Sequence, residues 1–410
     1  MMKKEQFYQI AKEYGTPSFL FDCDEVLERT KQIKKILSGG QGNEPIRLCY
    51  SIKANPFLVP YLITAVDFFE VCSPGELSIC QYSHVPGEMI IYSGVNKQLD
   101  DITEAIRYGA AILTAESIRQ FELISQAAVQ LKQHVSVILR LSSKSQFGMD
   151  LSDIKLLLKE HIKCDSYITI QGIHYFVGTQ RTKLKHQKEE LEELRKIIND
   201  LRSETSYELP MLEYGPGLCY PYFEGDNFED TLAPLKELAP TLSEAAGCSQ
   251  LTIEMGRFLA SSCGYYLTSV ADTKRSYERN WCILDGGINH VNYYGQLMGL
   301  KIPIIQHLPI DYDSSDSSVS EKSCEMENTD KWALCGSLCT TNDVLVREYE
   351  MHEPKLYDIL VFCNLGAYSI TEGIALFLSR DMPKVFVCNN GKITLLRDML
   401  ETWEMNTNYK

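Results

Sequence analysis

The feature that most constrains the fold is a regular alternation of short apolar runs, rich in β-forming residues, with longer amphipathic stretches. Eight such runs lie at 46–52, 68–73, 89–94, 110–115, 135–141, 168–178, 211–217 and 250–256. The stretches between them have helical spacing, most clearly 186–203, and an earlier helix is expected over 24–38, where Gly39 and Gly40 stop it. Eight strand–helix units predict a (β/α)8 barrel, although an open doubly wound sheet shows the same alternation.

Beyond about residue 258 the pattern changes, because strand-like runs follow one another without long helices between them. These runs lie at 265–276, 281–287, 301–308, 358–369 and 384–398. They predict a second, mostly β domain, so the expected fold is α/β, with a barrel over 24–270 and a β-rich domain built from 1–23 and 271–410. The acidic, serine-rich segment 311–330 is expected to be an exposed loop of the β-rich domain.

Composition excludes several classes of protein. The chain has 410 residues, of which 44% are hydrophobic and 23% charged, as in an ordinary globular protein of two domains. Its net charge of −15 argues against general binding of nucleic acid or anionic membranes. It has no apolar run long enough to span a bilayer, no clustered metal spacing and no CxxC pair among 14 cysteines, and no signal peptide is expected. A cytoplasmic protein with reduced thiols is therefore expected.

In a barrel of this kind the active site lies at the carboxyl ends of the strands. The residues expected there are Lys53, Ser73, Gly94, Arg140, His174, Gly178, Gly215, Gly217, Glu254 and Arg257. This set lacks the carboxylate cluster of a hydrolytic metal site and suits an anionic, electron-withdrawing cofactor held by a lysine. Lys53 follows a strand that should be buried, where desolvation and nearby positive charge prepare an amine for Schiff-base chemistry. An ordinary surface lysine at a strand end is the alternative.

Two neighbouring motifs fit the same kind of cofactor. The glycine-bearing turn YGPGL (214–218) offers backbone N–H groups that can bind phosphate, and Arg257 offers a guanidinium to the same neighbourhood. A carboxylate such as Glu254, placed against a pyridine nitrogen, keeps that nitrogen protonated and makes the ring a strong electron sink. The alternative for Glu254 is a surface salt bridge with Arg257.

These residues belong to eight motifs whose order resembles that of the fold-type III pyridoxal-phosphate decarboxylases, the group of diaminopimelate, ornithine and arginine decarboxylases. The motifs are YSIKAN (50–55), EVCSPGEL (70–77), ILRLSSKSQFGMD (138–150), GIHYFVGTQ (172–180), YGPGL (214–218), EMGR (254–257), CGSLCTTNDVL (335–345) and NLGAYS (364–369). The resemblance covers about residues 16–397. It implies an alanine-racemase-like fold, pyridoxal 5'-phosphate as cofactor, and decarboxylation at the Cα of an amino acid or an amino-acid-derived substrate.

The resemblance also implies roles for individual residues. Lys53 would carry the cofactor, Glu254 would bond its ring nitrogen, and Cys339 of a partner subunit would return or gate the proton at the substrate Cα. The other cofactor-binding residues would be Arg140, Phe176, Thr179, Gly215, Gly217, Gly256, Arg257 and the partner's Tyr368. Asp343 and Thr340 would contact the substrate. The active enzyme would therefore be a homodimer with shared active sites.

Departures from the family pattern bear on the substrate. Phe176 stands where the family usually has a ring-stacking histidine, and His174 resembles a packed barrel residue. Thr340 stands where diaminopimelate decarboxylases carry a glutamate, and no arginine follows the turn at 285–289. These differences favour a secondary-pathway branch, with siderophore precursors or carrier-tethered amino acids as substrates and a carrier protein as a possible partner. The alternatives are diaminopimelate decarboxylase proper, an alanine-racemase-like racemase, which Glu254 disfavours, and a catalytically silent binding homologue.

Overall fold

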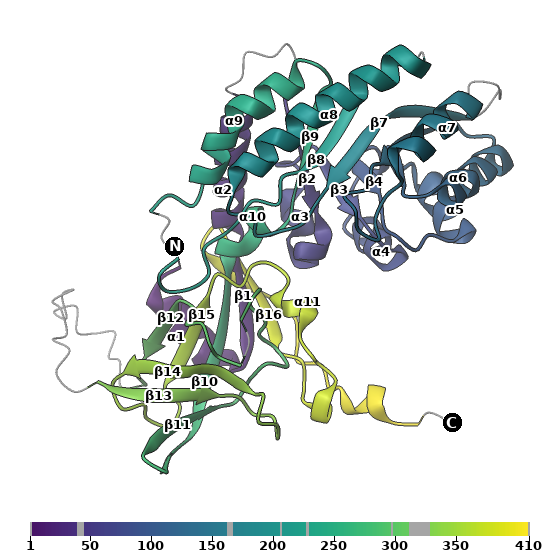
Figure 1. The fold of residues 1–410 in the computed structure, drawn as a ribbon. Coiled ribbons are helices and arrows are strands. Elements are labelled where there is room, and N and C mark those ends of the chain that lie inside the picture. Colours follow the sequence, from purple (N-terminus) through teal and green to yellow (C-terminus); the bar gives the residue numbers. More distant parts are fainter. Residues whose placement is uncertain are drawn as a thin grey trace. The chain divides into compact units, whose positions relative to one another are not determined.

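The computed structural model describes residues 2–38, 45–161, 167–205, 207–226, 229–296, 298–310 and 329–408. The chain divides into two units (Figure 1). The barrel unit comprises Leu27–Tyr220 and Phe228–Leu259, and the β unit comprises Met1–Val26, Pro221–Asn227 and Ala260–Lys410. This division places β10 (Gly264–Ser276) whole in the β unit, whereas the boundary expected at residue 270 falls inside that strand.

The barrel unit is built on a closed barrel of eight parallel strands. They are β2 (Arg47–Ser51), β3 (Phe68–Val71), β4 (Ile90–Tyr92), β5 (Ile112–Ala115), β6 (Val135–Arg140), β7 (Ile168–Phe176), β8 (Met211–Gly215) and β9 (Gln250–Met255). Each strand pairs with the next along the chain, and β9 pairs with β2 to close the ring. Every one of the eight apolar runs contains one of these strands, so the predicted barrel is confirmed and the open sheet is excluded.

Helices follow the strands around the barrel unit (Figure 1). They are α2 (Cys23–Leu37), α3 (Val59–Leu62), α4 (Pro74–Tyr82), α5 (Leu99–Tyr108), α6 (Ile118–Leu131), α7 (Leu151–His161), α8 (Leu184–Thr205), α9 (Ala233–Ala246) and the short α10 (Arg257–Ala260). The helix predicted over 186–203 is α8, which buries a stripe of leucine and isoleucine side chains, and the one predicted over 24–38 is α2. Gly39 and Gly40 lie outside the described residues.

The interior of the barrel changes from apolar to polar along its strands. A buried layer of apolar side chains includes Cys49, Phe68 and Met211. Because side chains alternate in a strand, the residues two positions later lie on the same inner face. On these three strands they are Ser51, Glu70 and Glu213. The barrel therefore has an apolar floor and a polar layer nearer to the carboxyl ends of its strands.

The β unit is built on a sheet of nine strands. They are β1 (Ser18–Asp22), β10, β11 (Arg279–Leu284), β12 (Ile305–Leu308), β13 (Asp330–Cys335), β14 (Val344–Met351), β15 (Ile359–Cys363), β16 (Lys384–Asn389) and β17 (Lys392–Arg397). The main order is β14-β13-β11-β10-β1-β16-β17, while β15 pairs with β10 and β12. β1 lies within the sheet, where Leu20 joins a core with Leu267 and Phe386.

Several elements of the β unit were not predicted as elements. They are β1, β13, β14 and the helices α1 (Lys4–Tyr14) and α11 (Ser369–Glu372). The loop predicted at 311–330 lies outside the described residues up to residue 328, and β13 begins at Asp330. The twelve cysteines that the structure describes are free thiols.

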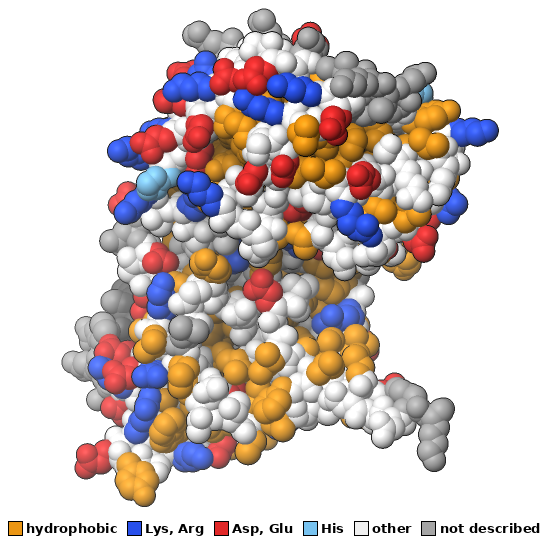
Figure 2. All heavy atoms as spheres, turned by 45° about the vertical axis from the view of Figure 1, so that its right-hand side comes forward, with side chains coloured by type: hydrophobic (Ala, Val, Ile, Leu, Met, Phe, Trp, Pro, Cys, Tyr) orange, Lys and Arg blue, Asp and Glu red, His pale blue; other side chains and the backbone are white. Residues whose placement is uncertain are grey.

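Exposed apolar side chains are numerous on the β unit (Figure 2). Its last segment carries Ile374, Leu376, Phe377, Leu378, Met399, Leu400, Trp403 and Met405, all of them exposed. Apolar surface of this density is characteristic of a surface that contacts another protein chain.

A buried histidine makes the stability of the β unit depend on pH. The Tyr266 hydroxyl lies 2.9 Å from His290 Nδ1, and the carbonyl oxygen of Asp381 lies 2.9 Å from His290 Nε2. Burial lowers the pKa of His290 to about 4. An unfolded histidine titrates near 6.5, so below that pH the unfolded chain binds more protons than the folded chain. The free energy of unfolding therefore falls as the pH falls from 6.5 toward 4.

We expect the free energy of unfolding of the β unit to fall by about 3 kcal/mol between pH 6.5 and pH 4 through this group. Chemical denaturation at a series of pH values measures the change. The variant His290→Gln should lose this part of the pH dependence, while the exposed His84→Gln should keep it. An unchanged pH dependence in His290→Gln would contradict this account.

Candidate active site

The barrel mouth holds an amine between two buried carboxylates. Lys53 lies in a short 3-10 turn (Ile52–Ala54) that directly follows β2. Its Nζ lies 2.6 Å from Glu70 Oε2, 3.4 Å from Glu254 Oε1 and 3.7 Å from Cys72 Sγ. Both carboxylates are buried, but 35% of the Lys53 side chain is exposed. Lys53 is therefore fixed inside the barrel mouth, unlike a surface lysine, and is still reachable from solvent.

Glu254 is held as an ionised carboxylate. The Ser51 hydroxyl donates a hydrogen bond of 2.7 Å to Oε1, and His174 Nε2 lies 3.4 Å from Oε2. Burial alone would raise the pKa of Glu254, but the positive charge of Lys53 and the contact with His174 hold that pKa well below its usual range. Its ion pair in the described structure is with Lys53, and its other close contact is with His174, so the alternative pairing with Arg257 does not describe it.

Two glycines leave the backbone bare at the end of β8. A Cβ on Gly215 would come 2.5 Å from Cδ2 of Phe176, and a Cβ on Gly217 would overlap the carbonyl oxygen of Gly178. Gly217 also has a φ of +60°, which favours glycine. The turn thus needs glycine at both positions, and it brings bare backbone beside the Phe176 ring.

Arg257 contacts the loop after β7, whose Gly178 carbonyl approaches Gly217 of the glycine turn. Its Nε donates a hydrogen bond of 3.2 Å to Thr179 Oγ1, and its side chain is largely buried. Gly256 precedes it at the end of β9 and is partly exposed. A guanidinium, a threonine hydroxyl and a glycine turn form a donor set that suits the oxygens of a phosphate group.

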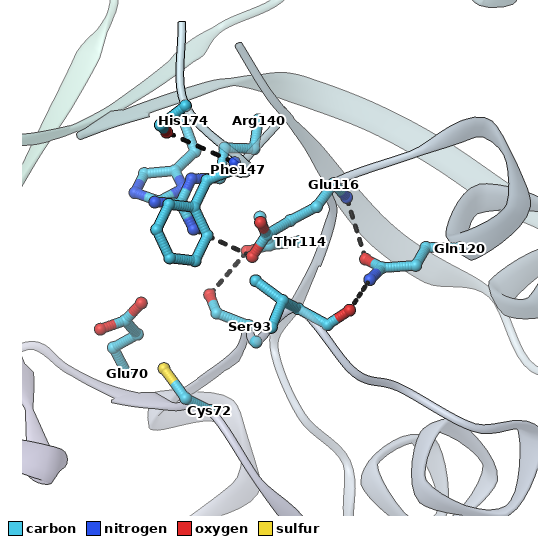
Figure 3. A network of polar contacts seen from close by, with 12 residues as sticks. Glu70, Cys72, Ser93, Thr114, Glu116, Gln120, Arg140, Phe147 and His174 are labelled. Carbon is cyan, nitrogen blue, oxygen red and sulfur yellow. Dashed lines mark hydrogen bonds and ion pairs between the residues drawn. The ribbon is translucent and has the colours of Figure 1, made fainter. Parts of the chain in front are cut away.

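Arg140, the last residue of β6, already contacts other side chains of the protein (Figure 3). Its Nη1 lies 2.9 Å from Glu116 Oε1, and its guanidinium lies 4.7 Å from the centre of the Phe147 ring. Gln120 braces this pair, since its side chain accepts from the Glu116 N–H and donates to the Val95 carbonyl. These contacts hold Arg140 in a buried network, and its expected contact with a cofactor stays a prediction.

The other predicted site residues belong to the β unit. Cys339 is exposed and Thr340 is partly exposed, in the loop after β13. Asp343 is 2% exposed, and its carboxylate accepts hydrogen bonds from the N–H groups of Ile288 and Leu338. It therefore orders this loop from within, and its expected contact with substrate stays a prediction.

Tyr368 precedes helix α11 and has a φ of 67°. Its backbone carbonyl accepts hydrogen bonds from the N–H groups of Thr371 and Glu372, so the residue begins the first turn of that helix. The expected contact of its side chain with a cofactor phosphate stays a prediction.

Sequence reasoning missed three residues of the Lys53 cluster. Glu70 and Ser51 were not singled out, and His174, although expected at a strand end, was given no role beyond packing in the barrel. The motifs that contain them were recognised. The alternation of side chains could have found Glu70, because it lies two residues after the inward-facing Phe68.

Comparison with known proteins decides the family. Residues 23–261, more than half of the chain, match the family model described as "Pyridoxal-dependent decarboxylase, pyridoxal binding domain". The chain belongs to the pyridoxal-dependent decarboxylases. As a member of this family it is a decarboxylase, and its cofactor is pyridoxal phosphate.

Similar proteins cover almost the whole of this decarboxylase. The L-glutamyl-[BtrI acyl-carrier protein] decarboxylase of Niallia circulans is 25% identical over 95% of this chain and 92% of its own. The diaminopimelate decarboxylase of Zymomonas mobilis is 25% identical over 95% and 91%. The crystal structure of the Methanocaldococcus jannaschii diaminopimelate decarboxylase with L-lysine has a TM-score of 0.81, at 22% identity, over 95% and 91% of the two chains. That likeness confirms the predicted barrel with an added β domain.

The residues of the barrel mouth fit the cofactor of the family. They supply one amine that solvent can reach, one buried ionised carboxylate, and the donor set around the glycine turn. No helix within the described ranges is both long and apolar enough to cross a membrane. Among the same residues, no group of acidic, histidine and cysteine side chains has the arrangement of a metal site.

The glycine turn can be tested with a matched pair of variants. Gly217 and Gly225 both have positive φ, so alanine strains both to a similar degree. Only the Gly217→Ala side chain would collide with backbone, because nothing lies within 4 Å of a Cβ on Gly225. We expect Gly217→Ala to weaken cofactor binding at least about tenfold, the equivalent of about 1.4 kcal/mol, and Gly225→Ala to leave it unchanged. Titration of the apoprotein with pyridoxal phosphate, followed by absorbance, measures both. Equal affinities would contradict this account.

Proposed function

We propose that this decarboxylase removes the α-carboxylate of an amino acid or an amino-acid-derived substrate, with Lys53 and Glu254 as its central catalytic groups. The observation that carries the proposal is the contact between the Lys53 amine and the buried, ionised Glu254 at the barrel mouth. This pair provides an attachment point for the cofactor aldehyde and a fixed negative charge for its ring.

When bound, pyridoxal phosphate accepts the electrons that are released as the bond between Cα and the carboxylate breaks. Lys53 would bind the cofactor covalently through Nζ, and Glu70 would orient that atom. Glu254 would accept a hydrogen bond from the ring nitrogen and keep the proton on it. Phe176 would pack against the ring through its phenyl face, which can stack but cannot donate a hydrogen bond.

The phosphate group would be bound by the glycine turn and its neighbours. Gly215 and Gly217 leave backbone accessible there, and Arg257 and Thr179 supply side-chain donors. Gly256 would add its backbone beside Arg257.

The family resemblance supports a homodimer in which each β unit completes the site of its partner. Cys339 and Tyr368 would act there, with the Cys339 thiol returning a proton to Cα and Tyr368 reaching the phosphate. The exposure of Cys339 and the apolar surface of segment 374–405 fit this arrangement. Asp343 would act only by ordering the loop that carries Cys339 and Thr340.

For the substrate, we favour an amino-acid derivative of a secondary pathway over free diaminopimelate. Thr340 and the lack of an arginine after 285–289 depart from the diaminopimelate pattern. One of the similar curated proteins acts, by its name, on a glutamyl group linked to an acyl-carrier protein. A racemase is disfavoured by Glu254, and a silent homologue is disfavoured by the intact cluster of Lys53, Glu254 and Arg257.

A panel of substrates tests this proposal. The cofactor-loaded protein is incubated with diaminopimelate, lysine, ornithine, arginine, glutamate, 2,3-diaminopropionate, its citryl conjugate and a carrier-linked glutamyl group, and CO2 release is measured. We expect release from one of the amino-acid derivatives and little from free diaminopimelate. Release from diaminopimelate alone would overturn the substrate proposal, and conversion of an L- to a D-amino acid without CO2 would show a racemase.

The role of Glu254 can be tested separately. Glu254→Gln keeps the size of the side chain but removes its charge, so we expect CO2 release to fall by about 100-fold or more, the scale of one lost electrostatic contact at a reacting centre. The absorbance of the lysine-bound cofactor should persist in this variant. Glu244→Gln, on the exposed face of α9, is the matched control. A Glu254→Gln enzyme with an unchanged rate would remove Glu254 from the mechanism.

A further inference from the structure

Next to Glu254, three adjacent side chains on the inner face of the barrel carry buried polar atoms with no partner among the described residues. They are Nδ1 of His174 on β7, both carboxylate oxygens of Glu213 on β8, and Oγ1 of Thr252 on β9. His174 pairs in register with Glu213, and Glu213 pairs with Thr252, so the three form one row across neighbouring strands. Each is at most 1% exposed.

An ionised Glu213 in this row would be strongly unfavourable in free energy. A buried charge without a partner is strongly destabilising, whereas a neutral carboxyl group needs only hydrogen bonds. Burial, reinforced by the negative charges of Glu254 and Glu70, raises the pKa of Glu213 well above its usual range. The charged and titratable groups that act on Glu213 are Glu254, Glu70, Lys53, Arg140 and Cys49, and the two cations are too weak to reverse the shift.

A neutral carboxyl group has an O–H that can donate a hydrogen bond, and the unpartnered atoms of its neighbours can accept one. A neutral imidazole carries hydrogen on one nitrogen and accepts on the other. If Nε2 of His174 donates to Glu254, then Nδ1 must accept. Buried polar atoms nearly always find partners, and an internal water with two to four polar neighbours is the usual solution.

We propose that Glu213 is a neutral acid that donates its proton in a hydrogen bond, through one internal water shared with Thr252, toward Nδ1 of His174. The water would then contact three polar groups of the row. The hydrogen bond fixes the His174 tautomer whose Nε2–H donates to Oε2 of Glu254. Glu213 is thus a positioning residue that acts on Glu254 through His174. This inference rests on the proposed role of Glu254 toward the cofactor ring.

The protonation state is tested by infrared spectroscopy of the full-length protein. The carbonyl stretch of a neutral, buried carboxyl group should be present in the wild type and absent from Glu213→Gln. It should still be present at about pH 7, well above the ordinary carboxyl pKa near 4. Glu192→Gln, on an exposed position of α8, should keep the band. This measurement needs no bound cofactor, so it can be interpreted even if the proposed function fails.

The positioning role is tested by the pH titration of the absorbance of the bound cofactor. Glu213→Gln keeps an N–H donor and should titrate like the wild type. Glu213→Leu should shift the midpoint by about one pH unit, as expected for a lost hydrogen bond to a charged group. Thr252→Val, which removes only the hydroxyl, should shift the midpoint in the same direction. This second variant keeps the test decisive if Glu213→Leu does not fold.

Several results would overturn the proposal. A carboxyl band that is absent at about pH 7 would show that Glu213 is ionised. A wild-type midpoint in both Glu213→Leu and Thr252→Val would show that the row only packs the barrel. A shifted midpoint in Glu213→Gln equal to that of Glu213→Leu would show that the donated hydrogen bond is not what matters.

Discussion

The ion pair of Lys53 with Glu70 and Glu254 is the interaction on which the rest of the site depends. Two carboxylates are buried at the mouth of the barrel, and one ammonium group stands between them. Taking such charges out of water is costly, so the arrangement persists only where the geometry is close and the remaining lone pairs are satisfied. Ser51 and His174 supply those contacts for Glu254.

The architecture places this charge cluster through the alternation of side chains in the strands. Apolar side chains such as Cys49 and Phe68 close the barrel floor, and the next inward-facing positions are polar. The glycines after β8 then leave backbone uncovered at the same end of the barrel. The apolar floor and the charge cluster thus follow from the alternation of side chains along the strands, and the glycine turn lies at the same end of the barrel. The groups that suit the chemistry of the family lie where the inward-facing side chains change from apolar to polar.

Much of this could be predicted from sequence, because barrel strands are buried on both faces and stand out as continuous apolar runs. The strands β13 and β14 were missed because charged residues such as Lys331 and Glu348 interrupt them. Lys53 and Glu254 were predicted from their motifs. Their partner Glu70 was not singled out. Its inward direction could be read from the alternation of side chains in β3, but its contact with Lys53 also depends on the pairing of β2 with β3.

The residues of the β unit show a second limit of prediction from sequence. Asp343 fits a family motif, and its burial and its two backbone hydrogen bonds also give it a structural role that the sequence alone does not display. The boundary expected at residue 270 also lies inside β10, because the change of pattern near residue 258 precedes this strand and does not fix where the strand begins.

The central claim is that Lys53 is the amine that carries the cofactor. The most direct measurement is borohydride reduction of the holoenzyme, followed by mass spectrometry of its peptides. The account predicts that the reduced cofactor is attached to the peptide containing Lys53. Lys97 is the informative competitor, because it is a buried lysine of the barrel unit and burial lowers its pKa to about 8. Attachment at Lys97, or at no lysine, would contradict the account.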